Sequence, residues 1–317
     1  MNKKLRRRIS LIHKQLVFLL YYSTKIKWVS KPQDKKRIII CFDGLFPHGG
    51  LVDRLKGIIS FYEVAKKLDY DFYIYFEHPF PLSYFLQPNK VNWKIDNIRY
   101  NLFNTKILYL MNNFNINPLE SVQKCNSKTI LVYSNVDYVG VMNKNNSLEE
   151  NSEIWRKNYY ELFKQSFELE FALKEFKLNN RIVIHTRFAS LMGDFKDTTS
   201  LILDNISKQK LINKLIKKIN QIAVLYNNTP IYILSDSVFF LNYIKENTKY
   251  FVLEGIPKHM DMGNDINNNS HLKTFMDFYF MAESDAIYLL KLDDMHHSGF
   301  SKYAAILGNT EWTVLQN

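Results

Sequence analysis

A histidine and an arginine follow one of the most apolar runs in the sequence. Residues 182–184 are Ile-Val-Ile, and His185-Thr186-Arg187 comes directly after them, so a buried strand would present both side chains at its carboxyl end. The planar guanidinium of Arg187 could hold two oxygens of a diphosphate and would stay cationic while a leaving diphosphate gathers charge. Taken alone, the triplet is more typical of a structural ion pair. The diphosphate prediction therefore depends on which other residues reach the same place.

Three further polar segments lie where strands end or helices begin. The first holds two adjacent glycines, which let backbone N–H groups approach an anion, although such turns often serve only the backbone. The second follows the next apolar strand, where an acid could accept hydrogen bonds from a base or a ribose and a serine could cap the following helix. The third is a Ser-Gly-Phe-Ser turn whose free N–H groups could cradle a phosphate. In sequence order, the residues concerned are His48, Gly49, Gly50 and Arg54; Ser235, Asp236 and Ser237; and His297, Ser298, Gly299, Phe300 and Ser301.

Apolar runs and amphipathic segments alternate along most of the chain, which is the pattern of parallel sheets flanked by helices. Two such α/β halves predict two Rossmann-like lobes, with ligands in the cleft at the carboxyl ends of the strands. We expect an amphipathic N-terminal segment over residues 1–35, a first lobe over 36–178 and a second lobe over 179–317. Strands are predicted at 37–42, 71–76, 106–110, 128–133, 181–185, 230–234, 250–253 and 286–290, helices at 51–68, 152–177, 208–226, 238–246, 272–281 and 299–307, and loops or lids at 143–151 and 261–270.

The order and spacing of these motifs resemble those of a known family. Gly-Gly-Leu-x-Asp-Arg-Leu at 49–55 is followed by His-x-Arg at 185–187, Ser-Asp-Ser at 235–237, a helix at 272–278 and Ser-Gly-Phe-Ser-x-x-Ala-Ala at 298–305. This succession is similar to that of the fucosyltransferase superfamily, which includes the nodulation α-1,6-fucosyltransferases, the α-1,2-fucosyltransferases and the protein O-fucosyltransferases. The resemblance covers most of the chain, because only the two ends lie outside the motifs.

The resemblance implies a GT-B fold and a glycosyltransferase that takes fucose from GDP-fucose, inverts the anomeric carbon and needs no cofactor or obligatory metal. By position, Arg187 corresponds to the arginine that contacts the donor diphosphate, with His185 as its partner. Two departures leave another nucleotide sugar as an alternative donor: residues 188–190 are Phe-Ala-Ser where many relatives have a second arginine and then an acid, and Val52 replaces a frequent glycine. The resemblance further implies that Asp236 lies near the nucleotide, Ser298 and Ser301 near the phosphates, and Gly49, Gly50 and Arg54 on the opposing lobe.

Sugar transfer also calls for a carboxylate that takes the proton of the attacking hydroxyl group. Asp194 lies seven residues beyond Arg187, at about the spacing of a catalytic glutamate in some relatives, and it is our candidate for this general base. Asp43 and Asp53 are alternatives. Asp194 could instead cap a loop, which is the more common role of an aspartate in such a place.

The sequence predicts neither a metal site nor a disulfide. The one Asp-x-Asp motif, at 69–71, precedes a strand, and the adjacent histidines at 296–297 have no spaced third ligand. Cys41 and Cys125 form no Cys-x-x-Cys pair, and Cys41 ends an apolar run in which a thiol would pack as a small hydrophobic group. A reducing cytosol fits this cysteine usage best.

The net charge of +11 comes from the N-terminal tail. Residues 1–37 hold twelve Lys or Arg and one acid, whereas the rest of the chain holds 30 basic and 30 acidic residues. A formally neutral body argues against a nucleic-acid groove on the folded lobes. A nucleic-acid function would have to rest on the basic tail alone, and we predict none.

The same tail has the pattern of an interfacial helix. Basic residues crowd its beginning, and an apolar stripe follows at helical spacing. The longest apolar run, at 16–22, is far shorter than the roughly 20 residues that span a bilayer. We expect residues 1–28 to make peripheral contact with anionic lipid, although the helix could instead pack on its own lobe. The stripe consists of Leu5, Ile9, Ile12, Leu16 and Leu19.

These observations predict an enzyme that adds fucose from GDP-fucose to a glycan acceptor. We expect it to act in bacterial surface polysaccharide synthesis, such as that of lipopolysaccharide or capsule, at the cytoplasmic face of the inner membrane. Two alternatives remain at this point. One is a glycosyltransferase of the same fold with another nucleotide sugar, and the other is a non-catalytic protein of the same fold that binds a glycan or a lipid.

Overall fold

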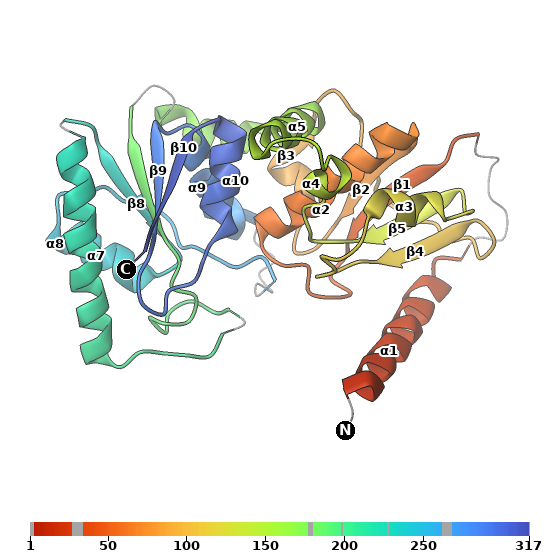
Figure 1. Cartoon of the computed structure of the whole chain (residues 1–317), viewed down its shortest axis with the longest axis horizontal. Helices are drawn as coiled ribbons and strands as arrows, with labels where there is room; N and C mark the ends of the chain where they lie inside the picture. The colour runs from red at the N-terminus through yellow and green to blue at the C-terminus, as the bar shows by residue number, and fades with distance from the viewer. Residues whose placement is uncertain are drawn as a thin grey trace.

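Two parallel four-stranded sheets form the centres of two lobes in the computed structural model of the chain (Figure 1). The sheets have the orders β2-β1-β5-β4 and β10-β9-β7-β8, and all pairings within them are parallel. This confirms the predicted α/β architecture. The structure describes residues 3–26, 34–176, 180–197, 199–226, 228–261 and 268–316. The strands are β1 Arg37–Phe42, β2 Asp71–Phe76, β4 Thr105–Tyr109 and β5 Thr129–Tyr133 in the first lobe, and β7 Ile182–Thr186, β8 Ile231–Ser235, β9 Ala286–Lys291 and β10 Glu311–Gln316 in the second.

The burial of each strand follows its place in the sheet. The central strands β1, β5, β7 and β9 are buried along almost their whole length, as expected where helices cover both faces. The edge strand β2 alternates between buried and more exposed residues instead. Because parallel strands end at the same edge of a sheet, the residues that follow β7 and β8 reach the same space.

Five of the helices that flank the sheets, α2, α7, α8, α9 and α10, agree with the prediction to within a few residues, whereas the short helices α3 and α4 were not predicted. Side chains cap several of them: Asp204 accepts a hydrogen bond from Ser207 N at the start of α7, and Ser237 accepts one from Phe240 N at the start of α8. These caps explain why the helices begin where they do. The bounds are α2 Leu51–Leu68, α3 Pro118–Gln123, α4 Val139–Met142, α7 Asn205–Leu225, α8 Val238–Asn247, α9 Leu272–Ala282 and α10 Gly299–Gly308.

The predicted helix at 152–177 was wrong, because the chain there forms two helices, a strand and a 3-10 turn. Helix α5 is Leu148–Leu162, strand β6 is Phe163–Gln165 and helix α6 is Phe167–Leu173. The break occurs because β6 pairs antiparallel with β3, and because the Ser166 hydroxyl accepts a hydrogen bond from Leu169 N and so starts a new helix. Helix α5 also begins inside the predicted loop 143–151, where Ser147 and Glu150 form a capping box. Strand β3 is Leu86–Pro88, and the short 3-10 turns are η1 Leu82–Tyr84, η2 Lys174–Phe176 and η3 Asn268–His271.

Two other differences concern the second sheet. The predicted strand at 250–253 is reduced to one bridge, in which Phe251 exchanges backbone hydrogen bonds with β8 beside Tyr232. Strand β10 was not predicted, because only its pairing with the apolar β9 holds this half-buried segment in the sheet. The predicted lobe boundary at 178 and most of the predicted loop 261–270 lie outside the described residues.

The two lobes share a continuous apolar core rather than touching only at a linker. Helix α5 lies between α2 of the first lobe and α10 of the second (Figure 1). The hydroxyl groups of Tyr159 on α5 and Tyr279 on α9 are 2.7 Å apart, and Tyr303 on α10 donates to Asp137 at 2.6 Å. These buried contacts fix the width of the cleft between the lobes.

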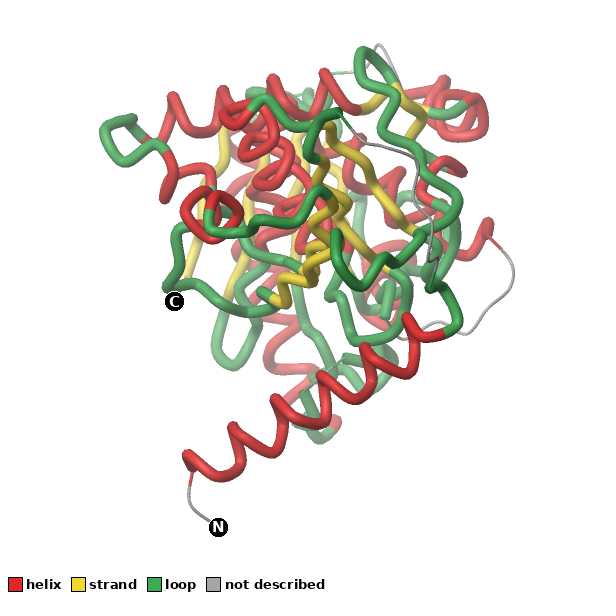
Figure 2. Tube along the Cα trace, turned by 90° about the vertical axis from the view of Figure 1, so that its right-hand side faces the viewer, coloured by secondary structure: helices red, strands yellow, loops and turns green. Residues whose placement is uncertain are grey.

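Helix α1, Lys3–Ser23, projects from the first lobe (Figures 1 and 2). Its C-terminal half packs on the sheet through Phe18 and Tyr22, and the Tyr22 hydroxyl lies 2.7 Å from that of Tyr133. Ile12, Leu16 and Leu19, three members of the predicted stripe, are more than half exposed. One face of the helix therefore packs on its own lobe, and these three apolar side chains lie on the other face. No helix within the described ranges is long and apolar enough to cross a bilayer.

Candidate active site

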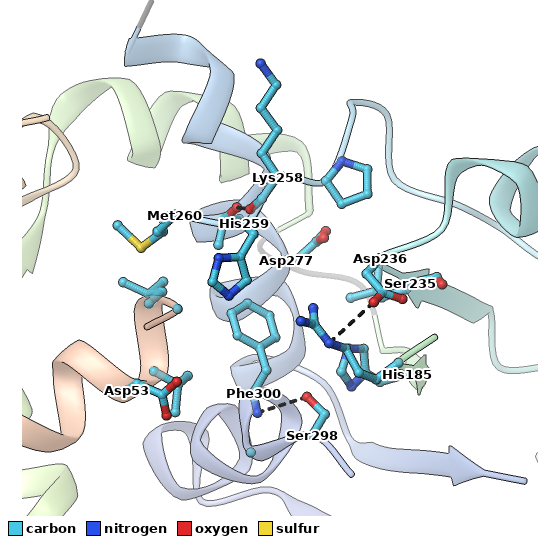
Figure 3. Close-up of a pocket in the computed structure, with 18 of the residues that line it drawn as sticks. Asp53, His185, Ser235, Asp236, Lys258, His259, Met260, Asp277, Ser298 and Phe300 are labelled. Atoms are coloured by element: carbon cyan, nitrogen blue, oxygen red, sulfur yellow. Dashed lines mark hydrogen bonds and ion pairs between the residues drawn. The ribbon is translucent and has the colours of Figure 1, made fainter. Parts of the chain in front are cut away.

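A cavity of about 360 Å³ lies between the lobes (Figure 3). The first lobe lines it with the first turn of α2, and the second lobe with the residues after β7 and β8, with residues 257–260, with one face of α9 and with the first turn of α10. The many polar and charged groups of this lining suit a ligand that is itself charged and rich in hydroxyl groups. Of the predicted site residues, Gly50, His185, Arg187, Ser235, Asp236, His297, Ser298, Gly299 and Phe300 line it; His48, Gly49, Arg54, Asp194, Ser237 and Ser301 are not among the described residues that do.

Arg187 enters the cavity between two carboxylates. Its Nε lies 3.3 Å from Asp236 Oδ2, one of its terminal nitrogens donates to Asp197, and its guanidinium stacks 4.9 Å from the ring centre of Phe195. These contacts hold the guanidinium in one orientation, as a structural ion pair would. A guanidinium has five N–H donors, so two carboxylates do not exhaust it. Since the side chain remains partly exposed to the cavity, Arg187 can bind an anionic ligand from a fixed position.

His185 is a buried, neutral imidazole in the cavity wall. Burial, together with the positive charges of Arg187 and Lys273, lowers its pKa to about 3. Its Nδ1 is buried and has no hydrogen-bond partner within the described part of the chain. The ring also lines the cavity, so a neutral, uncharged surface of His185 faces the ligand space.

Asp236 holds the turn that follows β7. Its two carboxylate oxygens accept hydrogen bonds from Phe188 N at 2.8 Å and Ala189 N at 2.7 Å, and Ala189 has a positive φ of 55°. Burial raises the pKa of Asp236, while Arg187 and the two N–H groups oppose that rise. The sequence suggested that this acid would accept hydrogen bonds from a base or a ribose, but backbone groups already occupy both oxygens. Asp236 thus positions Arg187 and its turn.

The first turn of α10 is open to the cavity. The Ser298 hydroxyl accepts a hydrogen bond from Phe300 N and caps the helix, while Gly299 and His297 complete this part of the wall. Lys56 reaches this turn from the first lobe, since its Nζ lies 3.4 Å from where a Cβ would stand on Gly299. Ser301 is instead buried and accepts from Trp312 Nε1 at 3.2 Å. A helix N-terminus beside a lysine, in a cavity that Arg187 also lines, has the chemistry to bind phosphate oxygens.

The turn at Gly49 is closed, because a carboxylate already lies in it. His48 N donates to one oxygen of Asp261 at 3.1 Å, and Gly49 N donates to the other. Arg54 donates to the same group at 2.7 Å and also to Gly49 O at 3.1 Å. The prediction that an anion binds here is met by a side chain of the second lobe, so these residues do not face the cavity. Gly50, one residue on, does.

Asp194, the predicted general base, caps a helix. Its carboxylate accepts from the Ser237 hydroxyl at 3.0 Å and from Phe239 N at 2.6 Å, at the start of α8. This is the loop-capping role that the sequence left open, and it keeps Asp194 out of the cavity lining. Asp53, one of the two alternatives, lines the cavity and is 43% exposed. The other, Asp43, is buried against Tyr133 and His48.

Several cavity residues were not identified from the sequence, among them Lys56, His259 and Asp277. Asp277 and Lys273 form a buried ion pair on α9, and the carboxylate lines the cavity. Burial raises the pKa of Asp277, and Lys273 opposes that rise. Two opposite charges four residues apart on the apolar face of a helix were a signal that could have shown this pair. His259 lies in a loop without periodicity, and nothing in the sequence pointed to it.

The solved structures to which this chain is similar include fucosyltransferases. The NodZ α-1,6-fucosyltransferase, in a crystal soaked with GDP-fucose, aligns with a TM-score of 0.51 at 14% identity, over 86% of this chain and 93% of its own. A variant of FUT1 from Arabidopsis thaliana, in complex with GDP, aligns with a TM-score of 0.56 at 12% identity, over 91% of this chain and 72% of its own. The chain has the GT-B fold. NodZ from Bradyrhizobium gives the same TM-score as the soaked crystal, 0.51, at 14% identity over 86% and 93% of the two chains. No protein-family model and no curated protein matches the sequence.

Proposed function

We propose that the protein is a glycosyltransferase that transfers fucose from GDP-fucose to a glycan acceptor. The cavity between the lobes holds both positively charged groups and a separate carboxylate, and this observation carries the proposal. Arg187, Lys56 and the first turn of α10 supply positive charge and N–H donors, whereas Asp277 supplies a buried carboxylate. A nucleoside diphosphate has the complementary pattern, with an anionic end and a base that carries donors. The GT-B neighbours support this reading, because NodZ was soaked with GDP-fucose and FUT1 binds GDP.

Asp277 favours guanine over uracil as the base. Guanine carries two neighbouring donors, its N1–H and its 2-amino group, which a single carboxylate can accept together. Uracil presents one N–H between two carbonyl groups, and a carboxylate would repel those carbonyls. The neutral imidazole of His185 also lines the cavity and offers a further contact to the nucleotide. The His-x-Arg pair would thus bind the donor at two points.

Transfer would proceed by direct displacement at the anomeric carbon. An acceptor hydroxyl oxygen forms the new C–O bond, the bond from the anomeric carbon to the diphosphate breaks, and GDP leaves with the bonding electrons. Arg187, Lys56 and the α10 N-terminus would stabilise the charge that gathers on the diphosphate. Asp53, which is exposed to the cavity from the opposing lobe, would take the hydroxyl proton. A single displacement of this kind inverts the anomeric configuration.

No metal is assigned a role in this proposal. Throughout the ranges that the structure describes, no three His, Cys, Asp or Glu side chains come together as they would around a metal ion. Lys56 and Arg187, which both line the cavity, instead supply positive charge to the diphosphate. Activity that persists with excess chelator would support this assignment, and activity that depends on added Mg²⁺ or Mn²⁺ would contradict it.

Residues 1–28 would attach the enzyme to the cytoplasmic face of the inner membrane, where surface polysaccharides such as lipopolysaccharide or capsule are built. The exposed stripe of Ile12, Leu16 and Leu19 and the basic residues at 3–8 support this placement. Vesicles with anionic lipid should retain the wild-type protein and lose a variant that carries Leu16→Glu and Leu19→Glu. Equal retention of both proteins would remove the helix from the proposal.

The donor is tested by titrating the protein with three nucleotides in a calorimeter. GDP should bind, IDP should bind roughly ten- to a hundredfold more weakly because it lacks the 2-amino group, and UDP should bind more weakly still. Arg187→Ala should lose GDP binding, while Arg99→Ala, an exposed arginine outside the cavity, should keep it. Equal affinity for GDP and UDP would favour another donor, and the absence of GDP binding at millimolar concentration would sink the proposal.

A further inference from the structure

A short segment of the second lobe, residues 257–261, crosses the cleft and ends on the first lobe. It is tied to α9 at one end, where the Thr274 hydroxyl donates to Lys258 O at 3.3 Å. At the other end Asp261 lies in the turn at Gly49, and residues 257–260 line the cavity in between. In Figure 3 the imidazole of His259 stands in the middle of the space between Asp53 and Asp277. We call residues 257–261 the strap.

The attachment of the strap is an ion pair inside a backbone cradle. The Asp261 carboxylate is 11% exposed and accepts from His48 N, Gly49 N and the fully buried guanidinium of Arg54. Burial lowers the pKa of Arg54 to about 10, against the opposing effect of Asp261, so Arg54 remains charged at neutral pH. Breaking a buried pair of this kind leaves an uncompensated charge. The carboxylate is therefore a firm attachment between the lobes.

The geometry of the turn leaves no simple substitute for Gly49. Its φ is +82°, and a Cβ there would lie 2.8 Å from Asp53 Oδ2. Glycine lets the backbone N–H groups point at the Asp261 carboxylate while Asp53, on the next turn, faces the cavity. The turn that holds Asp261 and the proposed general base, Asp53, are thus adjacent parts of the same tightly packed turn.

Asp261 also fixes the orientation of His259. Asp261 N donates to His259 Nδ1 at 3.2 Å. A neutral imidazole that accepts at Nδ1 must carry its proton on Nε2. The Nε2 lies 3.9 Å from where a Cβ would stand on Gly50, which also lines the cavity. The ring therefore presents an N–H donor to the bound ligand, and it cannot serve as a base in this state.

We infer that Asp261 is a positioning residue: its carboxylate, held by the Gly49 turn and Arg54, pins the strap across the cleft and aims the Nε2–H of His259 at the donor substrate. The inference rests on the proposed function only for the identity of that donor. The strap is separate from the residues proposed to bind the diphosphate, because it belongs to the loop between α8 and α9. Its expected consequence is that donor affinity depends on a carboxylate that does not touch the donor.

The attachment of the strap through Asp261 is tested first without any nucleotide, by amide hydrogen exchange on residues 43–50. In the wild-type protein the amides of His48 and Gly49 should be protected, and Asp261→Asn should speed their exchange at least tenfold. Asp204→Asn is the matched control, because that aspartate caps α7 far from this turn in the chain and should leave residues 43–50 unchanged. Unchanged exchange in Asp261→Asn would contradict the claim that the Asp261 carboxylate attaches the strap to the Gly49 turn.

The positioning role is tested by a double-mutant cycle in GDP affinity. Asp261→Asn and His259→Ala should each weaken GDP binding roughly tenfold, and the double variant should bind no more weakly than the weaker single variant, because one residue acts through the other. Additive losses, or a lower melting temperature with unchanged affinity, would overturn the role. If the wild-type protein binds no GDP, the proposed function fails, and the exchange result alone decides whether Asp261 attaches the strap to the first lobe.

Discussion

The turn at Gly49 and the turn at Ser298 begin from the same local chemistry and end in different states. Each places a glycine at or just before the first turn of a helix, and the sequence predicts an anion site at both. At Gly49 the N–H groups and Arg54 hold Asp261, whereas Ser298 and its neighbours line the open cavity. A turn that can hold an anion therefore does not specify which anion it holds. A carboxylate from a distant segment has taken one of the two sites.

Arg54→Ala should have the largest effect and should act on stability. The guanidinium is fully buried and satisfies Asp261, so its removal leaves that carboxylate without its cation. We expect the free energy of unfolding to fall by about 3–5 kcal/mol. Denaturant titration measures it, with Arg99→Ala as the control for loss of an exposed arginine. A loss below 1 kcal/mol would mean that the closed turn is not held by this pair.

Arg187→Ala should do the opposite, changing catalysis more than stability. Because Arg187 faces the open cavity, its loss removes stabilisation of the leaving diphosphate, and kcat/KM should fall roughly 10²- to 10³-fold. Steady-state assays with GDP-fucose and an acceptor measure this fall, alongside the melting temperature. If Arg54→Ala and Arg187→Ala lost the same activity at the same stability, the distinction between the two turns would fail.

Gly299→Asp would convert the open turn into a copy of the closed one. The new carboxylate would stand at the α10 N-terminus, close to Lys56, and would compete with phosphate for the same donors. GDP affinity should fall on the order of a hundredfold, a loss of about 2.7 kcal/mol. Gly299→Asn, which has the same shape without the charge, should lose much less. Equal losses in both variants would show that space, and not charge, governs this turn.

The fold was predictable from the sequence because its elements carry strong local signals. Apolar runs gave β1 and β2 their observed bounds, and the helix 51–68 was correct to the residue. The helix at 152–177 failed because two local signals inside it, the Ser166 cap and the pairing of β6, override its amphipathic pattern. Strand β10 depends on a partner strand, which no local pattern shows.

The site was predictable only where chemistry follows from position on a strand or helix. His185, Arg187 and the Ser298 turn lie where strand ends and helix starts must place them. The partners of the Gly49 turn and of Asp194 were not foreseeable, because Asp261 and Ser237 come from distant loops whose docking depends on the packed lobes. Sequence spacing therefore predicted two turns with the chemistry to hold an anion but could not say what occupies either of them.

His185, in the wall of the open cavity, makes the stability of the protein depend on pH. Its folded-state pKa is lowered to about 3, below the value of about 6.5 in the unfolded chain, so the unfolded state binds the proton first. The neutral ring therefore contributes stability that is fully present above pH 6.5 and is lost as the pH falls towards 3, by up to about 1.4 kcal/mol per pH unit. His185→Gln should flatten this part of the stability profile in denaturant titrations. An unchanged slope would contradict the buried neutral imidazole.

Two serine caps provide the smallest and cleanest comparison. Ser298 caps α10 beside the cavity, and Ser237 caps α8 outside its lining. Each Ser→Ala change should cost about 1 kcal/mol of stability. Only Ser298→Ala should also weaken GDP binding, by a few-fold in calorimetry. A matching loss of affinity in Ser237→Ala would indicate a general effect of helix fraying.

The most direct test of the account is a structure of the protein with GDP bound. We expect the β-phosphate at the first turn of α10 within reach of Arg187, with the Asp261 carboxylate still held by His48 N, Gly49 N and Arg54. A phosphate in the Gly49 turn, with Asp261 displaced from it, would contradict the assignment of one open and one closed anion site.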